Sequence, residues 1–278
     1  MSLEPGDTED RSLAHWSEAR RAEMDAFYRV ATLDYRELVR AWSHTARLAQ
    51  ATSDAPLRIL DVACGSGKFP AALREVDAIQ ALAPGALVLD LLDPSSFSVE
   101  EAAASLTAPM KAGRRLVHTL QDLPTDARDY DVVWAVHALY ALPEAELADG
   151  VVRFLEAMKP DGLGFIGHAT RSSHYLAFYE AYLEQFRPDG TPYTSAEVVA
   201  QAFRDAGATV NVAPLRYVQV IHEEPVLEGF LQRCLFDETL SLEAMRADPR
   251  LGAYLAERTT TDGSVRFTQD VAMITIQR

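Results

Sequence analysis

Apolar and polar residues alternate along this chain with two different periods. Between residues 11 and 50 the apolar side chains recur at helical spacing, and neither proline nor glycine interrupts them. From residue 57 onward the apolar residues gather into short, nearly continuous runs, which are typical of strands buried on both faces of a parallel sheet. Five such runs predict strands over 57–63, 86–93, 114–120, 130–139 and 163–169. Helical patterns over 99–111, 144–158 and 195–206 alternate with or follow these runs.

The C-terminal part of the chain departs from this alternation. Residues 215–222 and 265–276 alternate apolar and polar side chains, as strands with one solvated face do, and could pair antiparallel at a sheet edge. The chain between them looks helical over 225–258, where a doubly wound fold needs only a short connection. We therefore predict an α/β fold with a doubly wound, Rossmann-like, seven-stranded sheet that is mostly parallel and has an antiparallel last strand.

We expect a single domain over residues 1–278, because a chain of this length can form one large core. Its parts would be an N-terminal helical cap over 11–50, a Rossmann-like cofactor-binding core over 57–222 and 263–278, and a late helical insertion over 223–262.

Composition and charge disfavour several kinds of partner. The 41 acidic and 26 basic residues give a net charge of −15, which repels phosphate backbones and anionic membranes. We expect no transmembrane helix, and residues 1–10 lack the architecture of an export signal. The two cysteines, Cys64 and Cys234, fit neither a disulfide framework nor a zinc pattern. We expect a cytoplasmic protein with no nucleic-acid or membrane partner, in an oligomeric state that the sequence leaves open.

The first predicted strand ends in a turn of small residues, 61-DVACGSG-67. The glycines at 65 and 67 let a ligand approach the backbone, and the following helix start offers unpaired N–H groups to a polar or anionic ligand. A phosphate-binding loop would need Gly-Lys-Ser/Thr, but Phe69 follows Lys68. A dinucleotide fingerprint would need a third glycine where Pro70 stands. The turn therefore indicates a different nucleotide-like ligand.

An acidic residue followed by glycines at this spacing resembles motif I of the class I S-adenosylmethionine-dependent methyltransferases, with Ala63 in the place of the first glycine. Asp93, in "LLDPSS", stands where this family places a carboxylate that accepts both ribose hydroxyls. The resemblance implies S-adenosylmethionine as cofactor, S-adenosylhomocysteine as product, and no metal. Gln121 or Asp122 resembles the position that contacts adenine. The implied cofactor-binding residues are Asp61, Ala63, Gly65, Gly67, Asp93, Ser98, Gln121, Asp122 and Val136.

The order of features also resembles histamine N-methyltransferase and its relatives, small-molecule methyltransferases with leading helices and a late insertion. The matching segments are "LDPSS", "YDVVWAVHALYAL" and "GSVRFTQDVAMITI". This resemblance implies that His137 and Tyr140 act in catalysis on a small-molecule acceptor. The implied acceptor is a biogenic-amine-like or specialised-metabolite amine rather than histamine itself. The implied substrate-binding residues are Asp34, His137, Tyr140, Tyr175, Tyr179 and Gln269.

Other interpretations of the same residues stay open. O-methylation of a carboxylate or hydroxyl would use the same cofactor site and need a cationic clamp, for which Arg171 is the candidate. A non-catalytic module could have kept the cofactor pocket as a sensor or scaffold. His137 could be a core histidine, and the aromatic residues at helical spacing over 175–186 could be core packing. Only one of Gln269 and Asp270 should face inward, because side chains alternate along a strand.

Overall fold

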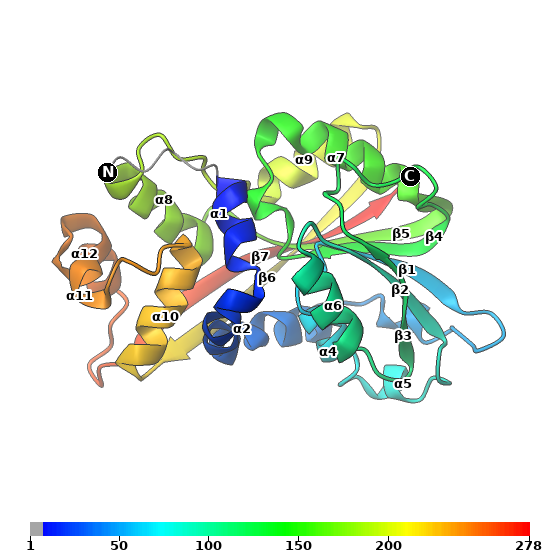
Figure 1. The fold of residues 1–278 in the computed structure, drawn as a ribbon, viewed down its shortest axis with the longest axis horizontal. Helices are drawn as coiled ribbons and strands as arrows, with labels where there is room; N and C mark the ends of the chain where they lie inside the picture. The colour runs from blue at the N-terminus through cyan, green and yellow to red at the C-terminus, as the bar shows by residue number, and fades with distance from the viewer. Residues whose placement is uncertain (1–7) are drawn as a thin grey trace.

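A seven-stranded sheet crosses the centre of the computed structural model, which describes residues 8–278 (Figure 1). The strands are β1 (Leu57–Val62), β2 (Leu87–Leu92), β3 (Met110–Leu116), β4 (Tyr130–Val136), β5 (Met158–Ala169), β6 (Thr209–Ile221) and β7 (Val265–Gln277). They lie in the order β3-β2-β1-β4-β5-β7-β6. The neighbours from β3 to β5 pair in parallel, whereas β7 pairs antiparallel with both β5 and β6. The predicted fold class is therefore confirmed.

Helices cover both faces of this sheet. They are α1 (Thr8–His15), α2 (Arg21–Ala41), α3 (Thr45–Leu48), α4 (Lys68–Leu73), α5 (Asp77–Gln80), α6 (Ser96–Ser105), α7 (Glu144–Ala157), α8 (His174–Phe186), α9 (Ala196–Asp205), α10 (Glu224–Leu235), α11 (Leu242–Ala247) and α12 (Pro249–Ala256), with short 3-10 helices η1 (Glu18–Arg20) and η2 (Leu139–Ala141). Apolar side chains of α2, α4, α5 and α6 form one core with the sheet. Those of α7 and α9 form a second core with it.

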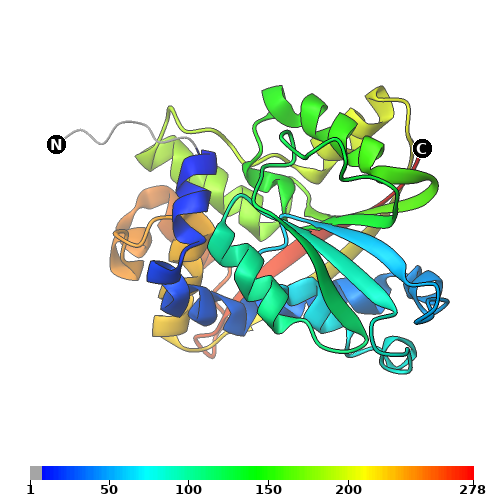
Figure 2. The ribbon, with the colours of Figure 1, turned by 45° about the vertical axis from the view of Figure 1, so that its right-hand side comes forward.

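A third apolar cluster lies beyond the parallel strands. Helices α8, α10, α11 and α12 gather at one end of the molecule, on the left of Figure 1, and pack against the ends of β6 and β7. Figure 2 shows α1 crossing the front of the molecule beside this group. Residues 225–258, predicted to be helical, form α10, α11 and α12 between β6 and β7. Helix α10 also contacts α2, so the N-terminal and late helices lie together.

The sequence pattern located the central strands better than the edge strands. In β4, Val132, Val133 and Trp134 are fully buried, as a continuously apolar run predicts. The third strand was predicted over 114–120 but lies at Met110–Leu116, and the helix before it ends at Ser105 rather than at 111. Strand β3 lies at the edge of the sheet, where charged residues are tolerated, so its polar residues gave no apolar run that predicts a strand. Pro109 helps to end the helical stretch before it.

Two further boundaries differ from the prediction. Strand β5 begins at Met158 rather than at 163, and β6 begins at Thr209 rather than at 215. The first part of β6 is largely exposed, so it carries no strong apolar signal.

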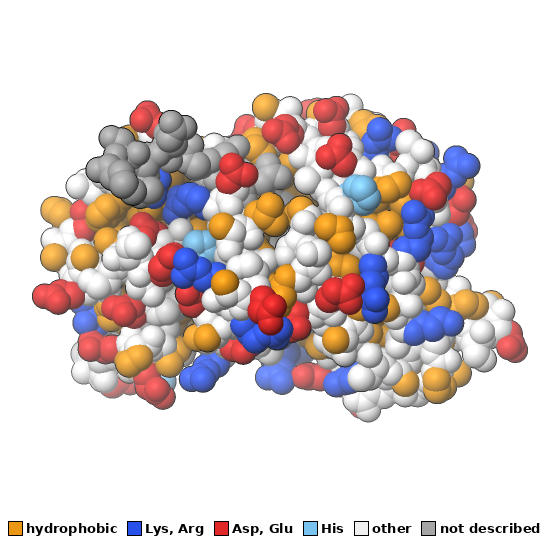
Figure 3. All heavy atoms as spheres, viewed as in Figure 1, with side chains coloured by type: hydrophobic (Ala, Val, Ile, Leu, Met, Phe, Trp, Pro, Cys, Tyr) orange, Lys and Arg blue, Asp and Glu red, His pale blue; other side chains and the backbone are white. Residues whose placement is uncertain are grey.

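The surface that Figure 3 shows has no large patch of one charge among the described residues. Acidic and basic side chains are interspersed over the face that Figure 3 shows. Among residues 8–278, no helix has the length and apolar character needed to cross a bilayer. Residues 1–7, for which we expect no export signal, lie outside the described part of the chain.

Trp42 follows α2 and joins that helix to the sheet. Its ring stacks on Phe165 with 4.7 Å between centroids and is 4% exposed. We expect Trp42→Ala to lower the free energy of unfolding by about 3–5 kcal/mol, because it leaves a cavity in a packed core. Urea denaturation measures this, with Val152→Ala, at a 47% exposed position, as a control that should change stability by less than about 0.5 kcal/mol. Equal losses in the two variants would contradict the expectation.

Candidate active site

A cavity of about 420 Å³ opens at the carboxyl ends of β1, β2 and β4. Ligands of doubly wound sheets bind at this edge, next to the point where the strand order reverses. The cavity is lined by residues at and after the ends of the strands, over 61–65, 68–69, 93–94, 118–121 and 136–142. The N-terminal segment contributes Asp10, Ser12, Leu13, Trp16, Tyr28 and Tyr35. We call this the cofactor cavity.

The turn after β1 has the backbone conformation that its glycines suggested. Gly65 and Gly67 have φ of +50° and +73°, and Ala63 has φ of +50°. Ala63 therefore adopts a left-handed conformation that glycine adopts most easily, which fits its place in the motif. The Gly65 N–H donates to Asp93 Oδ2 at 3.0 Å, and the Ser95 N–H donates to Asp93 Oδ1 at 2.9 Å. Asp93 thus joins the end of β2 to the turn after β1.

The structure brings six of the nine predicted cofactor residues to this cavity. These are Asp61, Ala63, Gly65, Asp93, Gln121 and Val136. Ser98 is fully buried in α6, and Asp122 is exposed and bonded to the Thr119 hydroxyl at 3.2 Å. Neither of them lines the cavity.

Gly67 has a different role from the one predicted. The bare backbone at Gly67 was expected to let a ligand approach, but Gly67 does not line the cavity. A Cβ atom on Gly67 would collide with the Ser105 hydroxyl and lie 3.3 Å from Ala102 Cα, both on α6. Gly67 therefore allows α6 to pack closely against the turn, and its contribution to the cavity is indirect.

Two of the three acids that line the cofactor cavity, Asp61 and Asp93, are enclosed. Burial raises the pKa of Asp61 to about 7, with a smaller contribution from the charge of Asp93. Burial also raises the pKa of Asp93 to about 6, against the two backbone N–H donors that favour its charged form. Within residues 8–278, Asp61 Oδ2 has no hydrogen-bond partner. The cavity therefore offers carboxylate oxygens to a ligand that brings donors.

A second, smaller cavity of about 80 Å³ adjoins the first. The two share five lining residues: Trp16, Tyr28, Tyr35, His137 and Tyr140. The rest of the small cavity is lined mainly from α2, α8, α10 and the end of β5. It is rich in aromatic side chains, and we call it the acceptor cavity.

Asp34 is the acid of the acceptor cavity, and a chain of hydrogen bonds fixes it. The Tyr175 hydroxyl donates to Asp34 Oδ2 at 2.6 Å, and Gln219 Nε2 donates to Oδ1 at 2.7 Å. Gln269 Nε2 donates to Gln219 Oε1 at 2.7 Å, and Ser173 Oγ donates to Gln269 Oε1 at 2.6 Å. Burial raises the pKa of Asp34 to about 7 despite these donors. Its carboxyl group therefore titrates near neutral pH.

The structure separates the predicted substrate residues into two groups. Asp34, His137, Tyr140 and Tyr175 line the acceptor cavity. Gln269 does not line it but is fully buried and supports Asp34 through Gln219, whereas Asp270 is more exposed and pairs with Arg216 at 2.5 Å. The prediction that only one of these neighbours faces inward is confirmed.

Tyr179 was predicted with Tyr175 to bind the substrate, but the structure does not bring it to the cavity that Tyr175 lines. Tyr179 lines neither of the two cavities. Its ring stacks on Tyr193 with 3.7 Å between centroids, and its hydroxyl lies 2.9 Å from Thr8 Oγ1 and 3.2 Å from Arg11 Nη1. The side chain of Tyr179 therefore connects α8, to which it belongs, with the N-terminal helix α1.

His137 lies where the two cavities meet. Its φ of +51° turns the chain away from β4, and its N–H donates to the Gly167 carbonyl at 2.8 Å. The ring lies edge-on to Tyr35 and Tyr175, at centroid distances of 5.8 and 6.4 Å. Burial lowers the pKa of His137 to about 3, with a further contribution from His168, so the imidazole is neutral at pH 7. Its Nε2 has no hydrogen-bond partner within residues 8–278.

Several lining residues carried no recognisable motif. Tyr28 and Tyr35 are seven residues apart in α2, and a helical face that carries them together with Asp34 could have signalled a pocket. Arg233 lines the acceptor cavity from α10 and gave no signal in the sequence.

Arg171, the predicted cationic clamp, is exposed, and its backbone N–H lies 3.3 Å from Glu197. No group of three or more potential metal ligands occurs among the described residues.

Comparisons with known proteins identify a methyltransferase domain in part of the chain and a shared fold over most of it. Residues 59–162 match a family described as a methyltransferase domain. The comparison with curated protein sequences gave no match. One similar solved structure is a putative methyltransferase from Bacillus halodurans C-125, with 12% identity, a TM-score of 0.55, and coverage of 84% of this chain and 98% of that one.

Two other solved structures share the fold. YcgJ from Bacillus subtilis has 14% identity and a TM-score of 0.53, over 85% of this chain and 99% of that one. Magnesium protoporphyrin IX methyltransferase from Synechocystis PCC 6803, solved with S-adenosylmethionine bound, has 13% identity and a TM-score of 0.53, over 100% of both chains. The matched segment covers residues 59–162, less than half of the chain, and the solved structures show that the whole chain has the fold of S-adenosylmethionine-dependent methyltransferases.

Proposed function

We propose that the protein transfers a methyl group from S-adenosylmethionine to the nitrogen of a small-molecule amine, as its resemblance to histamine N-methyltransferase implies. The observation that carries this proposal is an acid, Asp34, in an aromatic cavity that adjoins the cofactor cavity. Aromatic faces attract cations, and a carboxylate accepts hydrogen bonds from an ammonium group. In this proposal the acceptor lies between the N-terminal cap over 11–50 and the insertion over 223–262. The cofactor binds to the core over 57–222 and 263–278. The protein acts in the cytoplasm.

The cofactor cavity fits the proposed cofactor in size and chemistry. Its 420 Å³ lies within the range of ligand pockets, and Asp93 stands at the end of β2 with lone pairs left to accept ribose hydroxyls. Gly65 and Gln121 both line this cavity, and the resemblance assigns Gln121 or Asp122 to the contact with adenine. When bound, S-adenosylmethionine supplies an electrophilic methyl group, whose bond to sulfur breaks as the bond to the acceptor nitrogen forms.

The chain's own residues then have to prepare the nitrogen. An aliphatic amine arrives largely protonated at neutral pH, and Asp34 as a carboxylate can hold it and accept a proton. His137 is neutral and has an unpartnered Nε2 among the described residues, so it can orient the amine by a hydrogen bond. The enclosing rings of Tyr28, Tyr35 and Tyr175 limit access of water. Positioning carries most of the catalysis in this proposal.

Asp93→Ala tests the cofactor site. We expect affinity for S-adenosylmethionine to fall by about 10- to 100-fold, because a charged hydrogen-bond acceptor contributes about 1.5–3 kcal/mol and also holds the Gly65 turn. Isothermal titration calorimetry measures the affinity. Asp126→Ala, at a carboxylate that is 75% exposed, is the matched control and should bind normally. Undiminished binding by Asp93→Ala would contradict the site.

Asp34→Asn tests the acceptor acid through the pH profile. Because the pKa of Asp34 is raised to about 7, its carboxylate forms as pH rises through 7, and kcat/KM for an amine should rise with it. Asp34→Asn should lower kcat/KM by about 10²-fold and remove that part of the rise. Saturating cofactor keeps the titrations of Asp61 and Asp93 out of the profile.

Asp25→Asn is the control for this variant, because Asp25 is exposed on the same helix. It should keep both the rate and the profile. An unchanged rate and profile in Asp34→Asn would remove Asp34 from the mechanism.

His137→Ala tests the group at the junction of the cavities. We expect kcat/KM to fall by about 10²-fold while cofactor affinity changes only a few-fold, since the side chain acts on the second substrate. Initial-rate kinetics with calorimetry on the same samples separates the two effects. His222→Ala, at an exposed histidine, is the control. A loss confined to cofactor binding would show that His137 does not serve the acceptor.

A further inference from the structure

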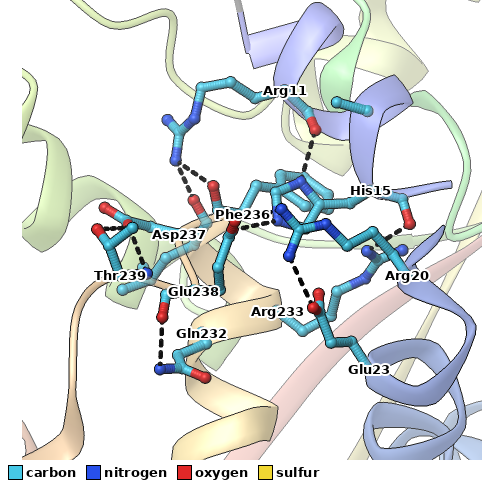
Figure 4. Close-up of polar contacts among 12 residues, drawn as sticks. Arg11, His15, Arg20, Glu23, Gln232, Arg233, Phe236, Asp237, Glu238 and Thr239 are labelled. Carbon is cyan, nitrogen blue, oxygen red and sulfur yellow. Dashed lines mark hydrogen bonds and ion pairs between the residues drawn. The ribbon is translucent and has the colours of Figure 1, made fainter. Parts of the chain in front are cut away.

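Arg233 is a buried cation in the wall of the acceptor cavity. It is 5% exposed, and its guanidinium carbon lies 4.5 Å from the ring centre of Trp16 and 5.3 Å from that of Phe236. Both rings also line the acceptor cavity. Nη1 donates to the His15 carbonyl at 2.9 Å, as Figure 4 shows. Within residues 8–278, Nη2 is enclosed and has no hydrogen-bond partner.

The bond to α1 explains only part of this arrangement. His15 ends α1, and a cation at a helix C-terminus is stabilised by the helix dipole, so Arg233 helps to hold α1 in place. That contact uses one nitrogen of a group with five N–H donors. An unpaired charge is costly to bury, and a neutral side chain of similar length could also fill the space. The structural contact alone does not account for an arginine here.

The neighbouring carboxylates are engaged elsewhere. Glu23 accepts from Arg20 at 2.7 Å, and Glu238 lies 3.1 Å from His15 Nε2 and also pairs with Arg20 (Figure 4). Among the described residues, no carboxylate forms an ion pair with Arg233. The cavity therefore has a cation that no carboxylate contacts directly, although the charge of Glu23 acts on it from a distance.

The acid of the same cavity is separate from this cation. Asp34 lies on α2 and takes its hydrogen bonds from Tyr175 and Gln219, whereas Arg233 comes from α10. One cavity thus carries two groups of opposite charge that do not pair with each other. Aromatic side chains such as Phe27 and Tyr28 make up much of the remaining wall.

We infer that Arg233 binds a carboxylate of the acceptor, so that the acceptor is an amino acid whose nitrogen is methylated. This inference rests on the proposed amine methylation. A guanidinium binds a carboxylate through charge-assisted hydrogen bonds, and the acceptor's carboxylate is the counter-ion that the cavity lacks. The ammonium group of the same molecule meets Asp34. An amine without a carboxylate leaves Arg233 uncompensated and is selected against.

Matched ligands test this selection. The probes are phenylalanine, phenethylamine, which lacks the carboxylate, and 3-phenylpropionate, which lacks the amine. Calorimetry in the presence of S-adenosylhomocysteine gives each dissociation constant independently of turnover. We expect the wild-type protein to bind phenylalanine at least about 10-fold more tightly than phenethylamine. Equal or weaker binding of phenylalanine would overturn the inference.

Arg233→Met removes the charge and keeps much of the volume. It should weaken the binding of phenylalanine and 3-phenylpropionate by about 10- to 100-fold and change the binding of phenethylamine by less than about 3-fold. Arg233→Lys should recover part of the lost affinity. Arg11→Met is the matched control, because Arg11 also ties α1 to the end of α10, at the Phe236 carbonyl (2.9 Å), but lines neither cavity. Thermal unfolding of each variant shows that it is folded.

Each outcome separates the inference from the function on which it rests. Equal losses for all three probes, or the same losses in Arg11→Met, would show that Arg233 only holds α1 and would overturn the inference. Arg233-dependent binding of 3-phenylpropionate, with no methylation of any amine, would support the carboxylate site and contradict the proposed amine methylation. Mass spectrometry could instead show that the protein forms the methyl ester of 3-phenylpropionate and that this reaction depends on Arg233. The carboxylate would then be the group that is methylated, and the inference that Arg233 only binds it would be overturned.

Discussion

Parallel pairing of β1 with β2 and β4 places three strand ends at one edge of the sheet, and the cofactor cavity depends on that constraint. The chain leaves β1 through a left-handed turn, which brings the Gly65 N–H to the Asp93 carboxylate at the end of β2. Asp61 ends up close enough to Asp93 for their charges to interact. Any shift of β2 along β1 would separate the turn from its acid, so the register of two central strands determines the shape of the site.

The acceptor cavity is held together by a different kind of contact. Its acid is fixed by buried hydrogen bonds that join α2, α8, β6 and β7, elements far apart in the sequence. Because Ser173, Gln269, Gln219 and Tyr175 each bond to a partner in this chain, Asp34 keeps one orientation. A buried polar network of this kind contributes little net stability but fixes position. Helix α8 and the last two strands therefore shape the acceptor cavity together with α2.

The sequence was most informative where one physical requirement acts alone. Burial on both faces produced the apolar runs of β1, β2 and β4, and the turn after β1 needed residues that tolerate positive φ. It was less informative where several environments suit the same residue type. Tyr175 and Tyr179 share a helix and a chemistry, yet Tyr175 faces Asp34 and Tyr179 faces α1. Arg233 sits in an ordinary helical segment, and only the tertiary packing reveals that its charge is enclosed.

The N-terminal segment joins the two cavities through Trp16. Trp16 lines both cavities, its carbonyl accepts from Ser95 Oγ at 2.6 Å, and its ring lies against the Arg233 guanidinium. One residue of the N-terminal segment thus lines both cavities and contacts the start of α6 on one side and α10 on the other. A change in the position of Trp16 therefore alters the walls of both cavities together.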